Sequence, residues 1–323
     1  MTTTRRAGVL LALATAGLSG VAVFLNASGV RAFGDATVYT TAKNAVAALV
    51  LAAVVALARP LGARLTRPTS RRQWVGLLAV GVIGGSLPFV LFFEGLARAT
   101  STQAAFLHKT LVLWVALLAI VLLRERLGFW HWLAIALLVL GQAGLAGGVT
   151  TGLGGGEGMI LAATLLWAVE VTVAKRLLHT LSSWTLGCAR MGLGSVALIA
   201  WVLVQGNGAA LVSLSAQQWQ WVLLTGAILA GYVGTWFAAL ARAQAVDVTA
   251  VLVLAAPVTA VIEAVLNGRA LGPQAGWLAL LLVGGGLVAL VAWRRADRDR
   301  AARAPSPLDP VGLDTPDRVR HAT

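Results

Sequence analysis

The chain has 323 residues, of which 59% are apolar and only 11% are charged, and its mean hydropathy is +0.84. These values exclude an ordinary soluble domain and are typical of membrane proteins. The formal net charge is +13, but the cations gather in the links between apolar stretches and in the tail, so we expect no nucleic-acid partner. The single cysteine, Cys188, excludes an internal disulfide and a cysteine metal site.

Ten apolar stretches follow one another along the chain, and each is close to the roughly 20 residues that a helical membrane span needs. No stretch alternates apolar and polar residues as a barrel strand does. We therefore predict an all-α integral membrane protein with ten transmembrane helices. They cover approximately residues 8–26, 37–58, 74–94, 103–123, 131–149, 158–178, 185–205, 218–238, 247–266 and 274–293.

An internal repeat runs through these stretches. The tetrapeptide Leu-Ala-Arg-Ala occurs at 96–99 and again, 144 positions later, at 240–243. The same register of 144 places Leu127 on Leu271 without a gap. Residues 8–25 also correspond to residues 158–175 by their place as the first span of each half. Each half holds five spans, an odd number, so the second copy enters the membrane from the opposite side. The sequence thus predicts two inverted five-helix repeats, a construction typical of secondary transporters.

The predicted organisation has three parts: a first five-helix repeat over 1–150, a second over 151–293, and a basic tail over 294–323 that we expect to be disordered. Of the lysines and arginines outside the spans, only Arg31, Arg98 and Arg269 fall in loops on the side opposite the N-terminus. The positive-inside rule then places both termini in the cytoplasm of a bacterial-type inner membrane. The arginines beside Trp293 are expected to contact anionic lipid. A cleaved signal peptide at the first span is the alternative, but it would break the pairing of the halves.

Several short motifs fall at corresponding places in this arrangement. A basic residue, Lys43 or Arg190, lies early in the second helix of each half. The others are Ala-Leu-Ala-Arg-Ala at 239–243, Leu-Leu-Arg-Glu-Arg-Leu at 122–127, Trp-Ala at 167–168 and three glycines at 284–286. In this order the motifs resemble the EamA family of the drug/metabolite transporter superfamily. The resemblance covers residues 8–293 and implies a ten-helix carrier of small solutes that is not an enzyme and has no cofactor.

The chain departs from the family pattern at a few positions. A proline often lies in the middle of the fourth and ninth helices of the family, and Pro257 fits, but Leu113 takes the equivalent place in the first half. The glutamate that ends the fourth helix is present as Glu125 and becomes Arg269 in the second half. These departures leave the architecture intact and bear on the substrate.

A charge within a span costs a few kcal/mol and indicates function or pairing, and six ionisable residues within the predicted spans are candidates for such a role. They are Lys43, Glu94, Lys109, Glu170, Arg190 and Glu263. His108 and Lys109 are notable because the second half has Leu252 and Val253 at those positions. This asymmetry indicates a contact specific to the solute, such as one to a carboxylate.

Further residues are expected to line a solute cavity between the two halves. We expect Trp167, Lys43, Arg190 and Glu94 to join His108 and Lys109 in lining it, although Trp167 fits helix packing as well. Proton coupling is predicted for Glu170 first and Glu263 second, because an unpaired buried carboxylate binds a proton more readily. Cross-helix ion pairing is the alternative for each. Pro257 frees a backbone carbonyl and permits a bend in a gating helix.

These observations predict a secondary transporter, an exporter of small metabolites, amino acids or drug-like solutes, that works by alternating access. Its partners would be the solute, membrane lipid and protons. A sugar-nucleotide or phosphate-ester exchanger of the same superfamily is the alternative within transport, since Lys43, Lys109 and Arg190 would supply converging cations. A membrane scaffold without transport is the alternative outside it. No catalytic residue set and no metal site is recognised, so an enzyme is not expected.

Overall fold

The computed structural model describes residues 2–99, 101–147, 154–268 and 270–301, and within these ranges every regular element is a helix. The first half contains α1 (Thr2–Phe33), α2 (Ala36–Leu57), η1 (Arg59–Leu61), α3 (Arg71–Ala79), η2 (Val80–Gly84), α4 (Leu87–Leu96), α5 (Ser101–Lys109), α6 (Leu111–Leu118), η3 (Ala119–Leu123) and α7 (Phe129–Leu145). The second contains α8 (Gly155–Leu177), α9 (Ser183–Val204), α10 (Gly208–Val212), α11 (Ala216–Leu240), α12 (Ala245–Leu252), α13 (Ala255–Asn267), η4 (Gly272–Gln274) and α14 (Ala275–Ala301).

The predicted all-α membrane class is confirmed. Among the described residues, nine helical segments are long and apolar enough to cross a membrane, and Phe129–Leu145 is a shorter apolar helix. Differences occur at the ends of the chain. α1 is longer than its predicted span, and α14 continues to Ala301, so residues 294–301 are helical where we expected a disordered tail. Residues 302–323 of that tail lie outside the described part.

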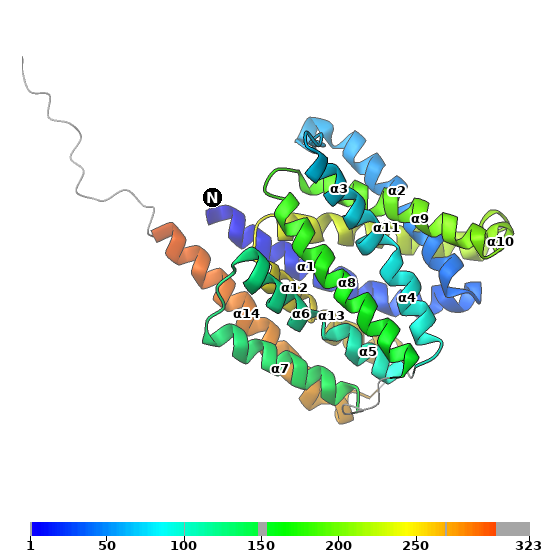
Figure 1. The fold of residues 1–323 in the computed structure, drawn as a ribbon. Coiled ribbons are helices and arrows are strands. Elements are labelled where there is room, and N and C mark those ends of the chain that lie inside the picture. The colour runs from blue at the N-terminus through cyan, green and yellow to red at the C-terminus, as the bar shows by residue number, and fades with distance from the viewer. Residues whose placement is uncertain (1, 100, 148–153, 269, 302–323) are drawn as a thin grey trace, which may run out of the picture.

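The helices pack in pairs that join the two halves of the chain. α1 lies against α11, α8 lies against α4, and α2 lies against both α9 and α11 (Figure 1). α7 lies along α14 at the edge of the bundle, where the ring of Trp277 covers Gly144 and leaves no room for a side chain. Small residues let helices approach closely in lipid. Neither half is therefore packed by itself, and the core is shared between them.

Three spans are interrupted instead of running as single α-helices. A π-helical turn, η2, separates α3 from α4. The fourth span breaks at Thr110, between α5 and α6, and the ninth breaks at Val253 and Leu254, between α12 and α13. The two breaks are 144 positions apart, which is the register of the sequence repeat. Interrupted helices at corresponding places of two repeats are where transporters bind solutes.

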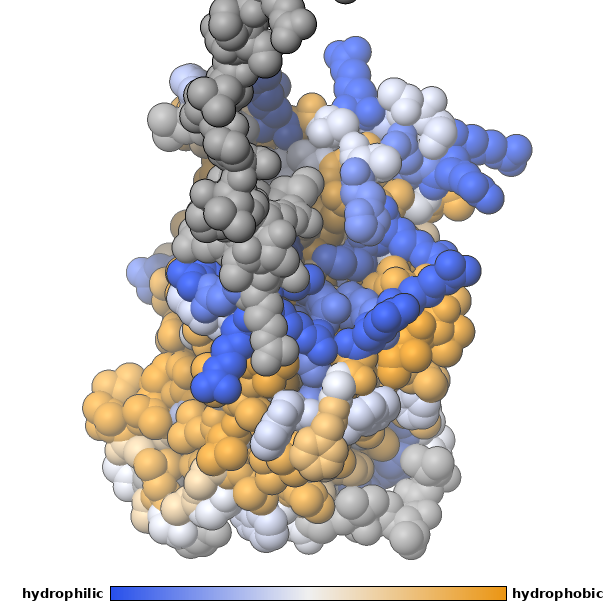
Figure 2. Space-filling view, turned by 90° about the vertical axis from the view of Figure 1, so that its left-hand side faces the viewer, coloured by the Kyte–Doolittle hydropathy of each residue, from blue (hydrophilic) through white to orange (hydrophobic). Residues whose placement is uncertain are grey.

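The surface is largely apolar, as lipid contact requires. Leu57 and Val204 are 80% and 81% exposed, values unusual for large apolar side chains of soluble proteins. Figure 2 shows the face on the side of the N-terminus, where hydrophilic side chains gather in the upper and middle part and apolar ones cover the lower part.

Candidate functional site

A central cavity of about 240 Å³ lies next to the helix breaks. Its walls come from α1, α2, α4, α5, α6, α8, α9, α11 and α12, so both halves contribute. The charged and titratable side chains that line it are Lys43, His108, Lys109, Glu170, Arg190 and Tyr232. The structure therefore brings together five of the residues named from sequence as solute contacts or proton carriers, with Trp167 as a sixth.

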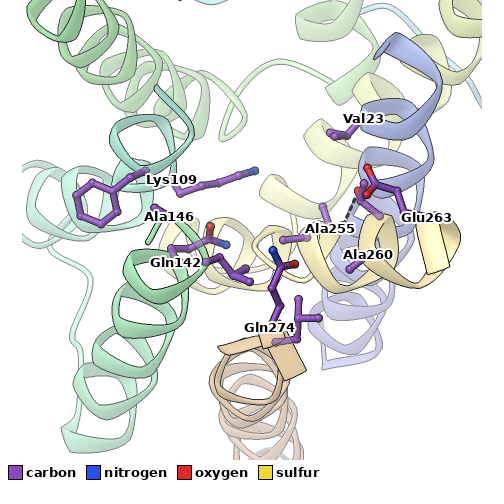
Figure 3. A pocket seen from close by; sticks show the side chains of 13 residues that line it. Val23, Lys109, Gln142, Ala146, Ala255, Ala260, Glu263 and Gln274 are labelled. Carbon is purple, nitrogen blue, oxygen red and sulfur yellow. Dashed lines mark hydrogen bonds between the residues drawn. The ribbon is translucent and has the colours of Figure 1, made fainter. Parts of the chain in front are cut away.

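A second cavity of about 570 Å³ adjoins the central one, and both are lined by Val23 and Lys109 (Figure 3). Gln142 of α7, Gln274 of η4 and Glu263 of α13 supply its other polar groups. In Figure 3 the amine of Lys109 reaches from α5 into the space between these elements. Lys109 therefore lies where the two cavities meet, and the other polar groups are distributed around them.

Glu170 and Arg190 form an ion pair in the wall of the central cavity. Arg190 Nε lies 3.4 Å from Glu170 Oε1, and the two side chains are only 10% and 3% exposed. The distance is long for a hydrogen bond, so the attraction is mainly that of the two charges. The sequence left open whether Glu170 pairs across helices, and the structure supplies Arg190 from α9. Glu170 therefore lacks the isolation that its predicted proton-carrying role assumed.

Lys43 has weaker electrostatic partners than Arg190. Its Nζ lies 3.4 Å from Asn26 Oδ1 and 5.0 Å from the centre of the Tyr39 ring, a cation–π distance. The same amide oxygen accepts a 2.7 Å hydrogen bond from the hydroxyl of Tyr39, which also contacts Thr225. Lys43 is thus held by polar and aromatic groups and by no carboxylate of the described residues.

Aromatic rings form much of the remaining wall. The ring of Trp167 meets those of His108 at 4.9 Å and Phe89 at 5.3 Å, both edge to face, and its Nε1 donates to Gly84 O at 3.2 Å. Tyr232 stacks on Trp236 with an interplanar angle of 8°. Such walls bind planar apolar groups well. Trp167 both packs between helices and lines the cavity.

Three sequence candidates lie elsewhere. Glu94 pairs with Arg98 at 3.0 Å on the surface of α4 and lines neither cavity, so its expected place in the cavity is not found. Glu263 lines only the second cavity. Pro257 lies in the first turn of α13, immediately after the break, where a missing N–H is tolerated.

A polar cluster that the sequence did not predict lies at the other end of the broken helices. Glu125 accepts hydrogen bonds from the backbone N–H of Ala245 at 2.7 Å and Val246 at 3.3 Å, which caps α12. Burial raises the pKa of the Glu125 carboxyl, against the effect of these N–H groups and of Lys175. The ammonium of Lys175, a residue of α8, donates hydrogen bonds to the backbone carbonyls of residues 240 and 243, at the end of α11 and just after it.

A buried pair completes this polar cluster. His131 Nε2 lies 3.2 Å from Asp247 Oδ1, and both side chains are 3% exposed or less. Sequence reasoning missed it because the residues are 116 positions apart and Asp247 begins its span, where an acidic residue indicates a helix start. The signal available was Glu125, the glutamate that the family pattern places at the end of the fourth helix. The cluster of Glu125, His131, Lys175 and Asp247 ties α7, α8 and α12 together.

Paired helix breaks beside a cavity lined by both halves of the chain are typical of membrane transporters of small solutes. The model of the EamA-like transporter family matches residues 6–146 and again 154–292. The chain therefore belongs to the EamA family, within the drug/metabolite transporter superfamily. A solved crystal structure, described only as that of a protein, is 19% identical and has a TM-score of 0.71 over 88% of this chain and 98% of its own. That likeness shows the shared fold. None of the curated proteins compared with the chain matches it.

Proposed function

We propose that the protein is a secondary transporter that exports a small solute across a bacterial-type inner membrane by alternating access. The observation that carries the proposal is the central cavity, lined by Lys109 and Glu170 from different repeats and lying beside the two helix breaks. Its volume of about 240 Å³ is below the roughly 300–1,000 Å³ of sites for drug-sized ligands, which favours a small metabolite.

The packing of the helices supports an inverted repeat. α1 packs on α11 as α8 packs on α4, so the first helix of each half meets the third helix of the other. The second helices, α2 and α9, pack on each other, and so do the fifth helices, α7 and α14. A pseudo-two-fold axis in the membrane plane produces this pattern of pairs. With ten spans both termini lie on the same side of the membrane, and the distribution of lysines and arginines outside the spans favours the cytoplasmic side.

The same arrangement assigns an outward-facing state to this structure. The second cavity reaches Leu145 at the end of α7 and Gln274 before α14, and both of these ends lie on the outer side in the proposed topology. The polar cluster of Glu125, His131, Lys175 and Asp247 lies on the cytoplasmic side and closes it. Inward opening would then require α12 to separate from Glu125, while the outer ends of α7, α13 and α14 come together.

The two other functions predicted from sequence fit less well. A phosphate-ester exchanger gains support from the convergence of Lys43, Lys109 and Arg190 on one cavity, but Glu170 already neutralises Arg190. A scaffold without transport gives no reason for a charged cavity between the repeats, because burying such groups costs a few kcal/mol each. A carrier uses them to bind its solute.

Counterflow into liposomes containing the purified protein tests transport. Liposomes loaded with unlabelled amino acids, amines or carboxylates should accumulate the matching labelled solute, for at least one solute of the panel. Leu229→Trp, which fills the central cavity, should abolish this uptake, whereas Val204→Trp, at an 81% exposed position outside both cavities, should keep it. Uptake no greater than in protein-free liposomes for every solute would refute the proposal.

Proton coupling is a second part of the proposal. One charge moved across the membrane contributes about 2.3 kcal/mol per 100 mV. Glu170 is the first candidate to carry the proton, in a state of the cycle that separates it from Arg190, and Glu263 is the second. Glu170→Gln should then lose accumulation driven by a proton gradient and keep exchange. Uphill transport that survives in this variant assigns Glu170 to the ion pair alone.

A further inference from the structure

The central cavity contains more cationic groups than its own carboxylate can neutralise. Lys43, Lys109 and Arg190 line it, and Glu170 is the only carboxylate among the described residues that does. Glu170 already forms an ion pair with Arg190, with 3.4 Å between Oε1 and Nε. Two ammonium groups therefore remain without a counter-ion in the cavity wall. A charge at this depth in a membrane protein is normally paired, so the missing partner is expected to come from a bound molecule.

The repeat shows why Lys43 lacks the partner that Arg190 has. Both are the early basic residue of a second helix, and the residues of α1 that line the cavity include no acidic one: they are Ser19, Ala22, Val23 and Asn26. The whole of α1 lacks acidic residues, since Asp35 is the first in the chain. Asp35 itself caps α2 through the N–H groups of residues 37 and 38.

Lys109 is not required by the architecture either. The second half has Val253 at the equivalent position, beside the same kind of helix break. The Lys109 ammonium makes no hydrogen bond or ion pair with the part of the chain that the structure describes, and Figure 3 shows it extended into open space. Its position at the last residue of α5 gives it only the weak attraction of a helix C-terminus. Lys109 is therefore free to meet an anion that enters through the second cavity.

The rest of the wall selects for a ring. Trp167, Phe89, Tyr232 and Trp236 line the same cavity and present both edges and faces of their rings. An ammonium group on the solute would find no free partner here, because Glu170 is occupied by Arg190. The chemistry that fits these groups is a planar apolar body with one negative charge and no positive one.

We propose that the solute is a small aromatic carboxylate whose anionic group is neutralised by Lys43 and Lys109 and whose ring packs against Trp167 and Tyr232. The inference rests on the proposed transport function and defines the substrate class of that site. It distinguishes aromatic acids from the amino acids and amines of similar size that share the ring.

Four probes with the same phenyl ring test the charge requirement. Purified protein in detergent is equilibrated with labelled phenylacetate, and unlabelled phenylacetate, phenylacetamide, phenylethylamine and phenylalanine are used as competitors. Phenylacetate should compete at least tenfold better than the other three, because phenylacetamide and phenylethylamine lack the carboxylate that meets the lysines, and the ammonium of phenylalanine finds no free carboxylate in the cavity wall. Equal or better competition by phenylethylamine or phenylalanine overturns the proposal, and so does the absence of any phenylacetate binding.

Variants assign the charge to the two lysines. Lys43→Met and Lys109→Met should each weaken phenylacetate binding about tenfold or more, and Lys43→Arg and Lys109→Arg should retain most of it. Arg98→Met, which removes an exposed cation outside both cavities, is the matched control and should bind as the wild type does. Elution as a single species with unchanged helix content shows that each variant is folded. Unchanged affinity in both Met variants overturns the proposal.

Failure of the substrate class and failure of transport give different results. A protein that exchanges neutral or cationic solutes in liposomes but does not bind phenylacetate is a transporter of another class. A protein that binds phenylacetate through the two lysines but carries no solute across the bilayer has the anion site without the proposed transport.

Discussion

At the scale of single residues, the ion pair between Glu170 and Arg190 is expected to stabilise the fold only while both charges are present. Arg190→Met leaves the Glu170 carboxylate buried and unpaired, which should cost about 3–5 kcal/mol, whereas the double variant with Glu170→Gln removes both charges and should recover most of that loss. Thermal unfolding in detergent measures the three midpoints. A double variant no more stable than Arg190→Met would show that the pair contributes through packing and not through charge.

Glu125, which lies between the fourth and fifth spans, should make the stability of the fold depend on pH. Burial raises the pKa of this carboxyl above its ordinary value of 4.5, so the folded protein holds the proton more tightly than the unfolded chain does. The stability from this proton is fully present below about pH 4.5 and is lost as the pH rises through the folded pKa. Glu125→Gln cannot ionise, so its unfolding midpoint should decline less than that of the wild type over this pH range.

The cap that Glu125 makes is a separate property. Glu125→Gln keeps an oxygen for the N–H groups of Ala245 and Val246, whereas Glu125→Ala leaves these buried donors unsatisfied at a cost of about 1–3 kcal/mol. The Ala variant should therefore unfold at a lower temperature than the Gln variant at every pH. Similar midpoints for the two variants would mean that water replaces the carboxylate at the start of α12.

At the scale of the elements, close approach of two helices positions Arg190. A Cβ on Gly194 would lie 2.7 Å from the Cα of Gly85, so α9 and the middle of the third span touch through their backbones. Gly194→Ala should push α9 outward, lower the unfolding midpoint and weaken solute binding. Gly192→Ala on the same helix meets nothing within 4 Å and should be neutral or slightly stabilising. If both variants behave alike, helix propensity and not the contact decides the result.

The sequence predicted helices better than it predicted the contacts between them. Apolar length located the spans because a bilayer imposes that length on every spanning helix. The breaks at Thr110 and at Val253 were only partly visible, since Pro257 marks one and no proline marks the other. The partner of Glu170 was left open because Arg190 lies on another helix, and helix packing, not local spacing, decides that pairing. Lys109 was identified because a cation in an apolar helix contrasts with Val253 in the repeat.

At the scale of the whole molecule, the number of crossings is determined by α7. This helix has 17 residues, which is about 26 Å at 1.5 Å per residue, slightly less than the roughly 30 Å of a hydrocarbon core. It lies along α14, a candidate span of full length, and the halves pack as inverted copies only if α7 crosses too. A shorter helix is accommodated by local thinning of the bilayer. We therefore expect α7 to cross, which makes ten spans.

Cysteine labelling in intact cells decides between ten crossings and nine. In a variant with Cys188→Ala, single cysteines are introduced at Leu65, between α2 and α3, and at Val212 in α10, both exposed positions. With a cytoplasmic N-terminus and ten spans, a membrane-impermeant maleimide should label Val212→Cys from outside, and Leu65→Cys only after the cells are opened. If α7 did not cross, every later segment would reverse, and Val212→Cys would also be protected. Labelling of Val212→Cys alone therefore establishes that α7 spans the membrane and that the two halves are inverted.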